Sequence, residues 1–306
     1  MLACAAPLAG AQAAPASPGR VPLPDGRHLF LNCTGQGSPT VLLEGGYAAD
    51  SNAWSGIQPV LAKTTRACSY DRAGYGESDM GPLPRDGRAV ASDLDQALKK
   101  ANINGPFVVV GHSIGAFYVR IFAERRPADV AGMVLVDPSI EYQDKRFAVT
   151  FGPNAGSAKP FHDKAARCLA AAEKHDLPSL NPFLASCVPD RKPETLKWAL
   201  NPVIWRTQLS EADTMFNATS DEADAGRFYY GDMPLIVLTA GDSYAYLPEP
   251  ARKAVTDFWN KLHDEIAARA MHGENRAVPH STHMMMFDRP DAITGAVLEM
   301  VKRLRK

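Results

Sequence analysis

Short apolar runs rich in β-branched residues alternate with amphipathic stretches along the first half of the chain. Each run is bounded by Gly, Pro or Asp, and together they cover residues 28–35, 40–46, 65–74, 107–113 and 130–138. Between them, residues 85–103 and 114–127 carry apolar side chains at helical spacing. Continuously apolar strands that alternate with helices predict an α/β fold, a mostly parallel sheet with helices on both faces.

This alternation breaks between residues 139 and 231, which are rich in Ala, Pro and helix formers and contain no clear strand. The pattern then resumes with a strand at 234–242, an amphipathic stretch at 248–270, a weak strand or loop at 274–283 and a last helix at 290–304. We therefore predict an α/β core made of residues 21–138 and 232–306, with a helical cap, or lid, inserted at 139–231.

The first 20 residues differ from the rest because they are small, apolar and uncharged up to Arg20. The sequence "AQA" at 11–13 is typical of a signal-peptidase site, although no positive segment precedes the apolar run. We interpret this stretch as the back half of a secretory signal; the alternative is a disordered Ala/Pro tail. No stretch reaches the 18 to 20 apolar residues of a membrane span.

Four cysteines follow that segment, and an even number in an exported chain allows two disulfides. Cys33 and Cys68 both fall in predicted strands, so we pair them, which leaves Cys168 with Cys187 to close a short loop. The alternative is four buried free thiols, as in a cytosolic protein. The disulfide interpretation, with the signal-like segment, predicts a secreted or periplasmic protein.

Charge and composition argue against several classes of partner. The net charge is −1, from 33 basic and 34 acidic residues, and no basic block indicates a nucleic-acid partner. No His, Asp or Glu cluster has metal-ligand spacing, and no glycine-rich loop is suited to a phosphate. The expectation is a protein without metal or cofactor that acts on a small molecule, with the oligomeric state left open.

The sequence "GHSIG" at residues 111–115 places Ser113 between two glycines, directly after an apolar strand and before a helix. In that context the turn is too tight for bulky flanking side chains, and the serine hydroxyl stands clear at the carboxyl end of the sheet. The backbone N–H of Ile114 points to the same place. We interpret Ser113 as a nucleophile; the alternative is an ordinary structural turn.

With this motif in place, the chain resembles the α/β-hydrolase family over residues 25–304. The residues that carry the resemblance are "LLEGGYAADSNAW" (42–54), "YDRAGYGES" (70–78), "GHSIG" (111–115), "LVDP" (135–138) and "STHMMMFDRPDAI" (281–293). The chain is most similar to secreted or periplasmic esterase-like members with a helical cap. It departs from the usual pattern in having Gly45-Gly46 where His-Gly is common and Ala116 where a glycine often follows.

A serine nucleophile needs a base and a group that orients the base. The resemblance implies His283 as the base, just before the last helix, with His280 as the main competitor. For the acid we favour Asp137, which ends the strand after the nucleophile, over Asp242. Asp-Pro is also common in simple turns. Asp242 ends the later strand, but the position where many members carry the acid, two residues on, holds Tyr244.

The second donor of an oxyanion hole is implied by the resemblance to be the backbone N–H of Tyr47, after the glycine pair, beside that of Ile114. The alternative is a flexible turn between strand and loop. Asp71 and Arg72 are charged residues of the sequence "YDRAGYGES" at 70–78. In this fold such residues more often brace loops near the site. We therefore do not assign them a catalytic role.

These residues predict a carboxylic-ester hydrolase that uses Ser113, His283 and an aspartate. The same residues leave open amide or lactone hydrolysis, a cofactor-free haloperoxidase or lyase reaction, and a non-catalytic binding protein. An aspartate nucleophile at position 113 would imply a dehalogenase or an epoxide hydrolase. The serine at this position disfavours both of these activities. The aromatic residues of the insertion suggest an apolar or aromatic substrate; the alternative is that they pack in the protein interior. These residues are Trp198, Trp205, Phe216, Phe228, Tyr229 and Tyr230.

Overall fold

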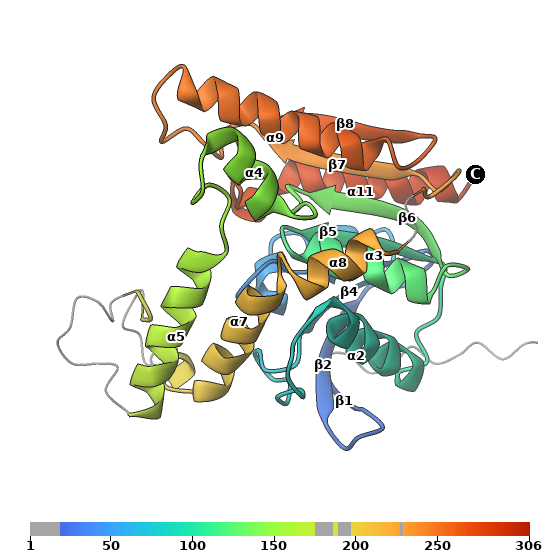
Figure 1. The fold of residues 1–306 in the computed structure, drawn as a ribbon. Coiled ribbons are helices and arrows are strands. Elements are labelled where there is room, and N and C mark those ends of the chain that lie inside the picture. The colour runs from blue at the N-terminus through green and yellow to red at the C-terminus, as the bar shows by residue number, and fades with distance from the viewer. Residues whose placement is uncertain (1–18, 175–185, 189–196, 227–228) are drawn as a thin grey trace, which may run out of the picture.

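A computed structural model describes residues 19–174, 186–188, 197–226 and 229–306. Residues 1–18 of the proposed signal-like segment 1–20, and Phe228, lie outside these residues, whereas Gly19 and Arg20 begin β1. The described part of the chain forms an eight-stranded sheet in the order β1-β2-β4-β3-β5-β6-β7-β8 (Figure 1). Its strands are β1 Gly19–Pro22, β2 His28–Thr34, β3 Thr40–Glu44, β4 Ala67–Asp71, β5 Phe107–His112, β6 Val130–Val136, β7 Leu235–Ala240 and β8 Gly273–Val278.

The sheet is mostly parallel, and this confirms the predicted α/β class. β1 pairs with β2 and β2 with β4 in antiparallel fashion, whereas β4, β3, β5, β6, β7 and β8 run parallel. The carboxyl ends of the six parallel strands therefore meet at one edge, where the loops after them can bring side chains together.

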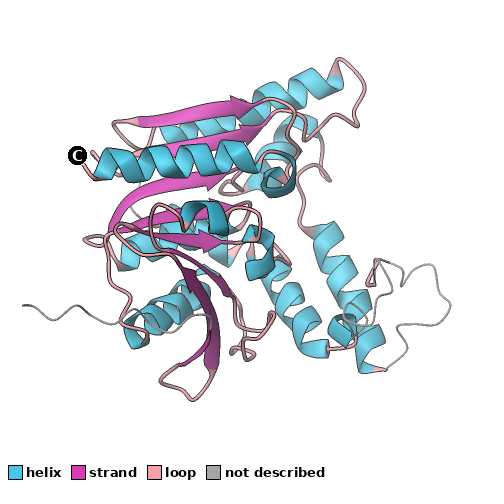
Figure 2. Ribbon diagram, turned by 180° about the vertical axis from the view of Figure 1, so that it is seen from behind, coloured by secondary structure: helices cyan, strands magenta, loops and turns pink. Residues whose placement is uncertain are grey.

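Both faces of the central strands are apolar because helices cover both. Val109, Leu135 and Val237 face one core, and their neighbours Val108 and Val134 face the other. The first core includes α2 Gly87–Lys100, α3 Gly115–Arg125 and α9 Ala251–Ala267, and the second includes α1 Gln58–Leu61 and α11 Pro290–Leu304. Figures 1 and 2 show the two layers from opposite sides. Period-two alternation between two buried faces explains why these strands are apolar throughout.

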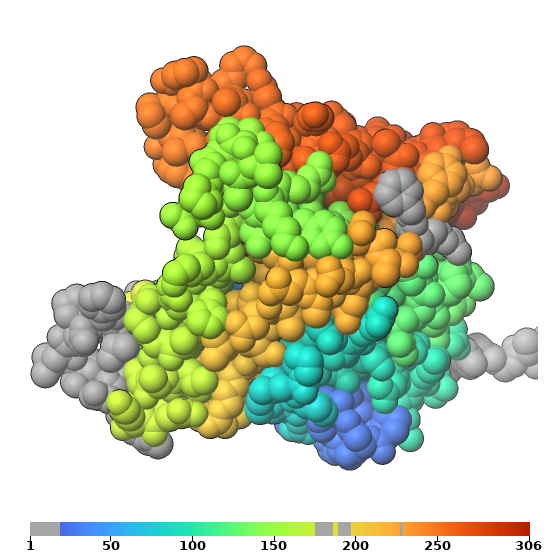
Figure 3. Space-filling model, in the orientation of Figure 1, coloured from blue at the N-terminus to red at the C-terminus, as the bar shows by residue number. Residues whose placement is uncertain are grey.

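Four described helices lie between β6 and β7: α4 Gln143–Phe151, α5 Lys159–Glu173, α7 Pro202–Thr214 and α8 Ala218–Asp224. α5 and α7 pack side by side and project beyond the sheet (Figure 1), and they form the yellow-green and amber surface in Figure 3. α8 returns to contact α2 and α3. Two short helices, η1 Ser51–Trp54 and α10 Met285–Asp288, lie in the core part of the chain.

Two disulfides are present. Cys33 and Cys68 lie directly opposite each other on β2 and β4, and their Cα atoms are 4.0 Å apart. Cys168 of α5 is joined to Cys187, and both lie in a small buried cluster with Trp205 of α7. The second disulfide thus lies within the packing of α5 on α7.

The edges of the sheet differ most from the predicted elements. β1 was not predicted as a strand, and β8 was predicted only as a weak strand or loop. β8 is hard to recognise because it is a polar edge strand: Arg276 points toward α11 and binds Glu299 at 2.8 Å. No helix in the described part of the chain is long and apolar enough to cross a bilayer.

Candidate active site

Ser113 lies in a sharp turn between β5 and α3, with a positive φ of 54°. The flanking glycines are required by close packing: a Cβ on Gly115 would lie 2.5 Å from the carbonyl oxygen of Gly45. A Cβ on Gly111 would lie 2.7 Å from the carbonyl oxygen of Gly115. The turn therefore holds a strained serine against the loop that follows β3, with its hydroxyl partly exposed.

His283 lies in the loop between β8 and α10 and contacts two of the other predicted residues. Its Nε2 is 3.0 Å from Ser113 Oγ, and its Nδ1 is 2.6 Å from Asp137 Oδ2. A carboxylate only accepts hydrogen bonds, so Nδ1–H donates to Asp137 and Nε2 is left to accept the Ser113 hydroxyl proton. This is the arrangement in which a serine can be deprotonated as it attacks.

Asp137 is a buried carboxylate that ends β6, with only 1% of its side chain exposed. Besides His283, its oxygens accept from the Trp259 indole N–H at 2.9 Å and from the Ala240 backbone N–H at 3.1 Å. Burial by itself raises the pKa of Asp137, but the hydrogen bond and charge of His283 outweigh it, so the pKa lies below its ordinary value. Asp137 is thus held ionised and fixed in position.

Asp242 and His280, the alternative acid and base, do not reach Ser113. Asp242 is 50% exposed, and its carboxylate lies 3.8 Å from Nδ1 of His280, which is 90% exposed. The backbone N–H of Asp242 donates to the Ser281 carbonyl at 2.8 Å. The two side chains form a weak pair at the surface, separate from the hydrogen-bonded chain of Ser113, His283 and Asp137.

His112, inside the sequence "GHSIG" at 111–115, supports His283 by a hydrogen bond to the His283 backbone. Its Nε2 lies 2.7 Å from the His283 carbonyl oxygen, and the two rings are 4.7 Å apart. Since a carbonyl only accepts, Nε2 carries the proton. Burial, together with the charge of His283, lowers the pKa of His112 to about 3, so it remains neutral. The sequence places His112 next to Ser113, but no local pattern indicates its contact with His283.

The loop after β3 passes directly beside the serine. A Cβ on Gly46 would lie 3.1 Å from Ser113 Cβ and 2.7 Å from His112 Nδ1, so only glycine fits there. Tyr47 follows at once. Among backbone contacts within the described residues, neither the Tyr47 N–H nor the Ile114 N–H donates to a carbonyl.

Asp71 braces a neighbouring turn, as the sequence analysis expected for this motif. Its carboxylate accepts from the backbone N–H of Ser51 at 2.8 Å and of Glu77 at 2.9 Å. Asp71 thereby joins the turn at 71–77 to the first residue of η1, and no hydrogen bond links it to Ser113 in the described structure.

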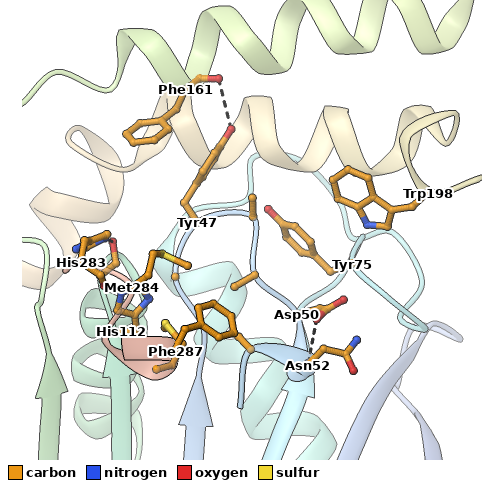
Figure 4. Close-up of a pocket in the computed structure, with 16 residues that line it drawn as sticks. Tyr47, Asp50, Asn52, Tyr75, His112, Phe161, Trp198, His283, Met284 and Phe287 are labelled. Carbon is orange, nitrogen blue, oxygen red and sulfur yellow. Dashed lines mark hydrogen bonds between the residues drawn. The ribbon is translucent and has the colours of Figure 1, made fainter. Parts of the chain in front are cut away.

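A cavity of about 690 Å³ opens over Ser113 and His283. Its walls are mainly apolar, and Figure 4 shows Met284 and Phe287 on the histidine side with Trp198 opposite. Phe161 of α5 lies above, its ring 5.1 Å from that of Tyr47. Asp50 is the one carboxylate among the described residues that line the cavity.

The aromatic residues of the insertion contribute less to this cavity than their number suggested. Trp198 lines it, whereas Trp205, Phe216 and Tyr230 are buried in the protein interior and Tyr229 lies at the surface. The additional apolar wall comes from Met284, Met286 and Phe287 beside the base. Within the described residues, no group of three His, Cys, Asp or Glu side chains could hold a metal ion.

The family model described as the alpha/beta hydrolase fold matches residues 39–243, more than half of the chain. The chain belongs to the α/β-hydrolase family. Among curated relatives of this hydrolase, the uncharacterized protein YqjL of Bacillus subtilis is 23% identical over 265 residues, which are 83% of this chain and 84% of YqjL. Several other curated relatives are matched over less than half of their own length.

Solved structures of similar fold include enzymes of more than one activity. The epoxide hydrolase CorEH superposes with a TM-score of 0.68 at 16% identity, covering 94% of this hydrolase and 99% of CorEH. A thermophilic esterase from Thermogutta terrifontis superposes with a TM-score of 0.63 at 19% identity, covering 95% and 100% of the two chains. At these identities the likeness concerns the fold, and the reaction has to be argued from the site.

Proposed function

We propose that this α/β hydrolase cleaves carboxylic esters through an acyl-enzyme formed on Ser113. The observation that carries the proposal is the hydrogen-bonded chain from Asp137 through His283 to Ser113 at the floor of an apolar cavity. A serine at this position suits acyl transfer, since it forms an ester that water can release. Epoxide opening through a carboxylate nucleophile would need an aspartate there.

In the first step His283 Nε2 takes the Ser113 proton while Oγ attacks the ester carbonyl carbon. The carbonyl oxygen becomes an oxyanion, to which the backbone N–H groups of Tyr47 and Ile114 donate. His283 then gives its proton to the leaving alcohol as the C–O bond breaks. In the second half His283 takes a proton from a water that attacks the acyl carbon; the bond from that carbon to Ser113 Oγ then breaks, the acid leaves, and His283 returns the proton to Oγ. Asp137 keeps the imidazole in the required tautomer throughout.

The insertion at 139–231 acts in this proposal as a cap over the core formed by 21–138 and 232–306. Support comes from two of its residues, Phe161 and Trp198, which line the cavity together with residues of the core. Their position favours a substrate with an apolar or aromatic acyl or alcohol group.

We further propose that the protein works outside the cytosol, secreted or in a periplasm. The two disulfides support this location, because such bonds form and persist in oxidising compartments. Peptide mapping of exported protein without reductant should recover Cys33 linked to Cys68.

The test of the reaction is a panel of p-nitrophenyl esters of increasing acyl length, run beside matched amides and lactones with Ser113→Ala as the blank. We expect Ser113-dependent turnover of the esters and much slower turnover of amides. Turnover of lactones or amides that exceeds turnover of every ester would contradict the ester assignment while leaving the nucleophile in place. No Ser113-dependent reaction with any of them would favour a binding protein.

A further inference from the structure

Arg72 lies just after β4 in a motif that the proposed mechanism does not use, and its side chain is only 2% exposed. Its guanidinium lies between two buried carboxylates. Nη1 donates to Glu44 Oε1 at 2.7 Å, and Nε donates to Glu211 Oε1 at 2.8 Å. Tyr70 and Tyr75 donate their hydroxyls to the remaining oxygens of Glu44 and Glu211. The network is therefore buried, and each carboxylate oxygen accepts a hydrogen bond.

The same guanidinium also holds the loop beside Ser113. Nη1 donates to the Gly45 carbonyl at 3.0 Å, and Nη2 donates to the Gly46 carbonyl at 2.8 Å. In a trans peptide the C=O and the following N–H point in opposite directions. Because Arg72 draws the Gly46 carbonyl toward itself, the N–H of Tyr47 is turned away from Arg72. Gly46 lies against Ser113, so this direction leads into the cavity.

We propose that Arg72 is a positioning residue that sets the Tyr47 N–H for the oxyanion, and that Glu211 of α7 makes this setting depend on the inserted helices. The inference rests on the proposed function, since it concerns an oxyanion formed at Ser113. Arg72 suits this task because its planar fork can hold two carbonyls and two carboxylates at once, which a lysine ammonium cannot.

A purely structural ion pair is the alternative, and the molecule contains one for comparison. Arg120 of α3 is equally buried and pairs with Glu141, and its Nε donates to the Tyr230 hydroxyl at 3.0 Å. None of these three residues lines the cavity over Ser113. Replacing Arg120 therefore measures what loss of a buried guanidinium costs the fold, without disturbing the loop.

The experiment compares Arg72→Lys with Arg120→Lys in the full chain. Four quantities are measured: kcat and KM for an ester, the affinity of an aryl trifluoromethyl ketone that adds the serine to form an oxyanion, and the affinity of the matching methyl ketone. For Arg72→Lys we expect kcat to fall about 100-fold, as for loss of an oxyanion donor, with KM within about three-fold. Trifluoromethyl ketone affinity should fall in parallel and methyl ketone affinity should hold. Arg120→Lys should leave kcat, KM and both ketone affinities near their wild-type values.

Glu211→Gln provides the second variant in case Arg72→Lys does not fold, because it nearly conserves shape and leaves Arg72 in place. We expect about a ten-fold fall in kcat, matched by the trifluoromethyl ketone. The inference would be overturned, with the proposed function intact, if the wild type is active and a folded Arg72→Lys or Glu211→Gln variant keeps both the wild-type kcat and the wild-type ratio of the two ketone affinities. A wild type without Ser113-dependent turnover or ketone binding would overturn the proposed function as well.

Discussion

The two sides of Ser113 are held in place by different kinds of interaction. On the acid–base side, Asp137 is a single buried charge surrounded by N–H donors from Trp259, Ala240 and His283. On the side of the proposed oxyanion hole, Arg72 lies between two buried carboxylates and donates to the carbonyls of Gly45 and Gly46. The first arrangement is built wholly from the α/β core, and the second takes Glu211 from the insertion. Changes in the insertion should therefore alter oxyanion binding before they alter the base.

The largest expected effect comes from removing the base. His283→Ala should lower kcat/KM by about 10⁴-fold or more, because the Ser113 hydroxyl then has no proton acceptor. His280→Ala is the matched control three residues away, and it should stay within about two-fold of wild type because that ring lies at the surface. Equal losses in the two variants, with both folded by circular dichroism, would remove His283 from the mechanism.

Replacing the acid should have the next largest effect. Asp137→Asn keeps the size of the side chain but favours the wrong imidazole tautomer, so the rate should fall by about 10³ to 10⁴-fold. Asp242→Asn should cost less than about three-fold. Steady-state kinetics on one ester decide between them, and a crippled Asp242→Asn beside a nearly normal Asp137→Asn would reverse the assignment.

The buried network around Arg72 should affect how the free energy of unfolding depends on pH. Burial raises the pKa of Glu44 from 4.5 to about 7, against the lowering effect of Arg72. The unfolded chain then releases this proton at lower pH than the folded protein does. Wild type therefore loses stability relative to Glu44→Gln as the pH rises through this window, by about 3 kcal/mol. Urea titrations of both proteins at pH 4 and pH 8 measure the difference; parallel pH profiles would contradict the raised pKa.

The smallest expected effect concerns substrate charge. Asp50 lines the cavity and also caps η1 by accepting from the Asn52 N–H at 2.9 Å. Asp50→Asn keeps the cap, since Asn serves equally well there, and removes the charge. The ratio of kcat/KM for an ammonium-bearing ester over a carboxylate-bearing one should fall about two- to five-fold, as expected for charges several ångströms apart near water. Neutral esters should be unaffected, and an unchanged charge ratio would exclude Asp50 from substrate selection.

The sheet and the main site residues could be predicted because their signals are local. Ser113 is marked by two glycines between an apolar strand and a helix, and the structure brings it within hydrogen-bonding distance of His283 and Asp137. The carboxyl ends of parallel strands meet at one edge of the sheet, so the order of residues along the chain limited which histidine and aspartate could lie beside Ser113. Tyr244, in the place of a later acid, favoured Asp137 over Asp242.

What could not be predicted depends on contacts between distant segments. The motif led us to expect that Arg72 braces a loop near the site, and its hydrogen bonds to the Gly45 and Gly46 carbonyls fit that expectation. Its partner Glu211 lies 139 positions away, and no local pattern indicates that pairing. Glu211 lies in a helix whose polar and apolar residues give no clear buried face in the sequence. The apolar wall at Met284 and Phe287 was hidden for a similar reason, since those residues read as part of the histidine motif. Strand β8 escaped a firm assignment because its edge position tolerates charges such as Arg276.

The nucleophile is the central claim, and covalent trapping tests it most directly. Wild type and Ser113→Ala are each treated with a fluorophosphonate, digested and mapped by mass spectrometry, while loss of ester turnover is followed in the same samples. We predict one adduct, on the peptide that contains Ser113, formed in proportion to the lost activity, with neither adduct nor turnover in Ser113→Ala. An adduct on another residue, or a folded Ser113→Ala variant that keeps more than a tenth of the wild-type rate, would contradict the account.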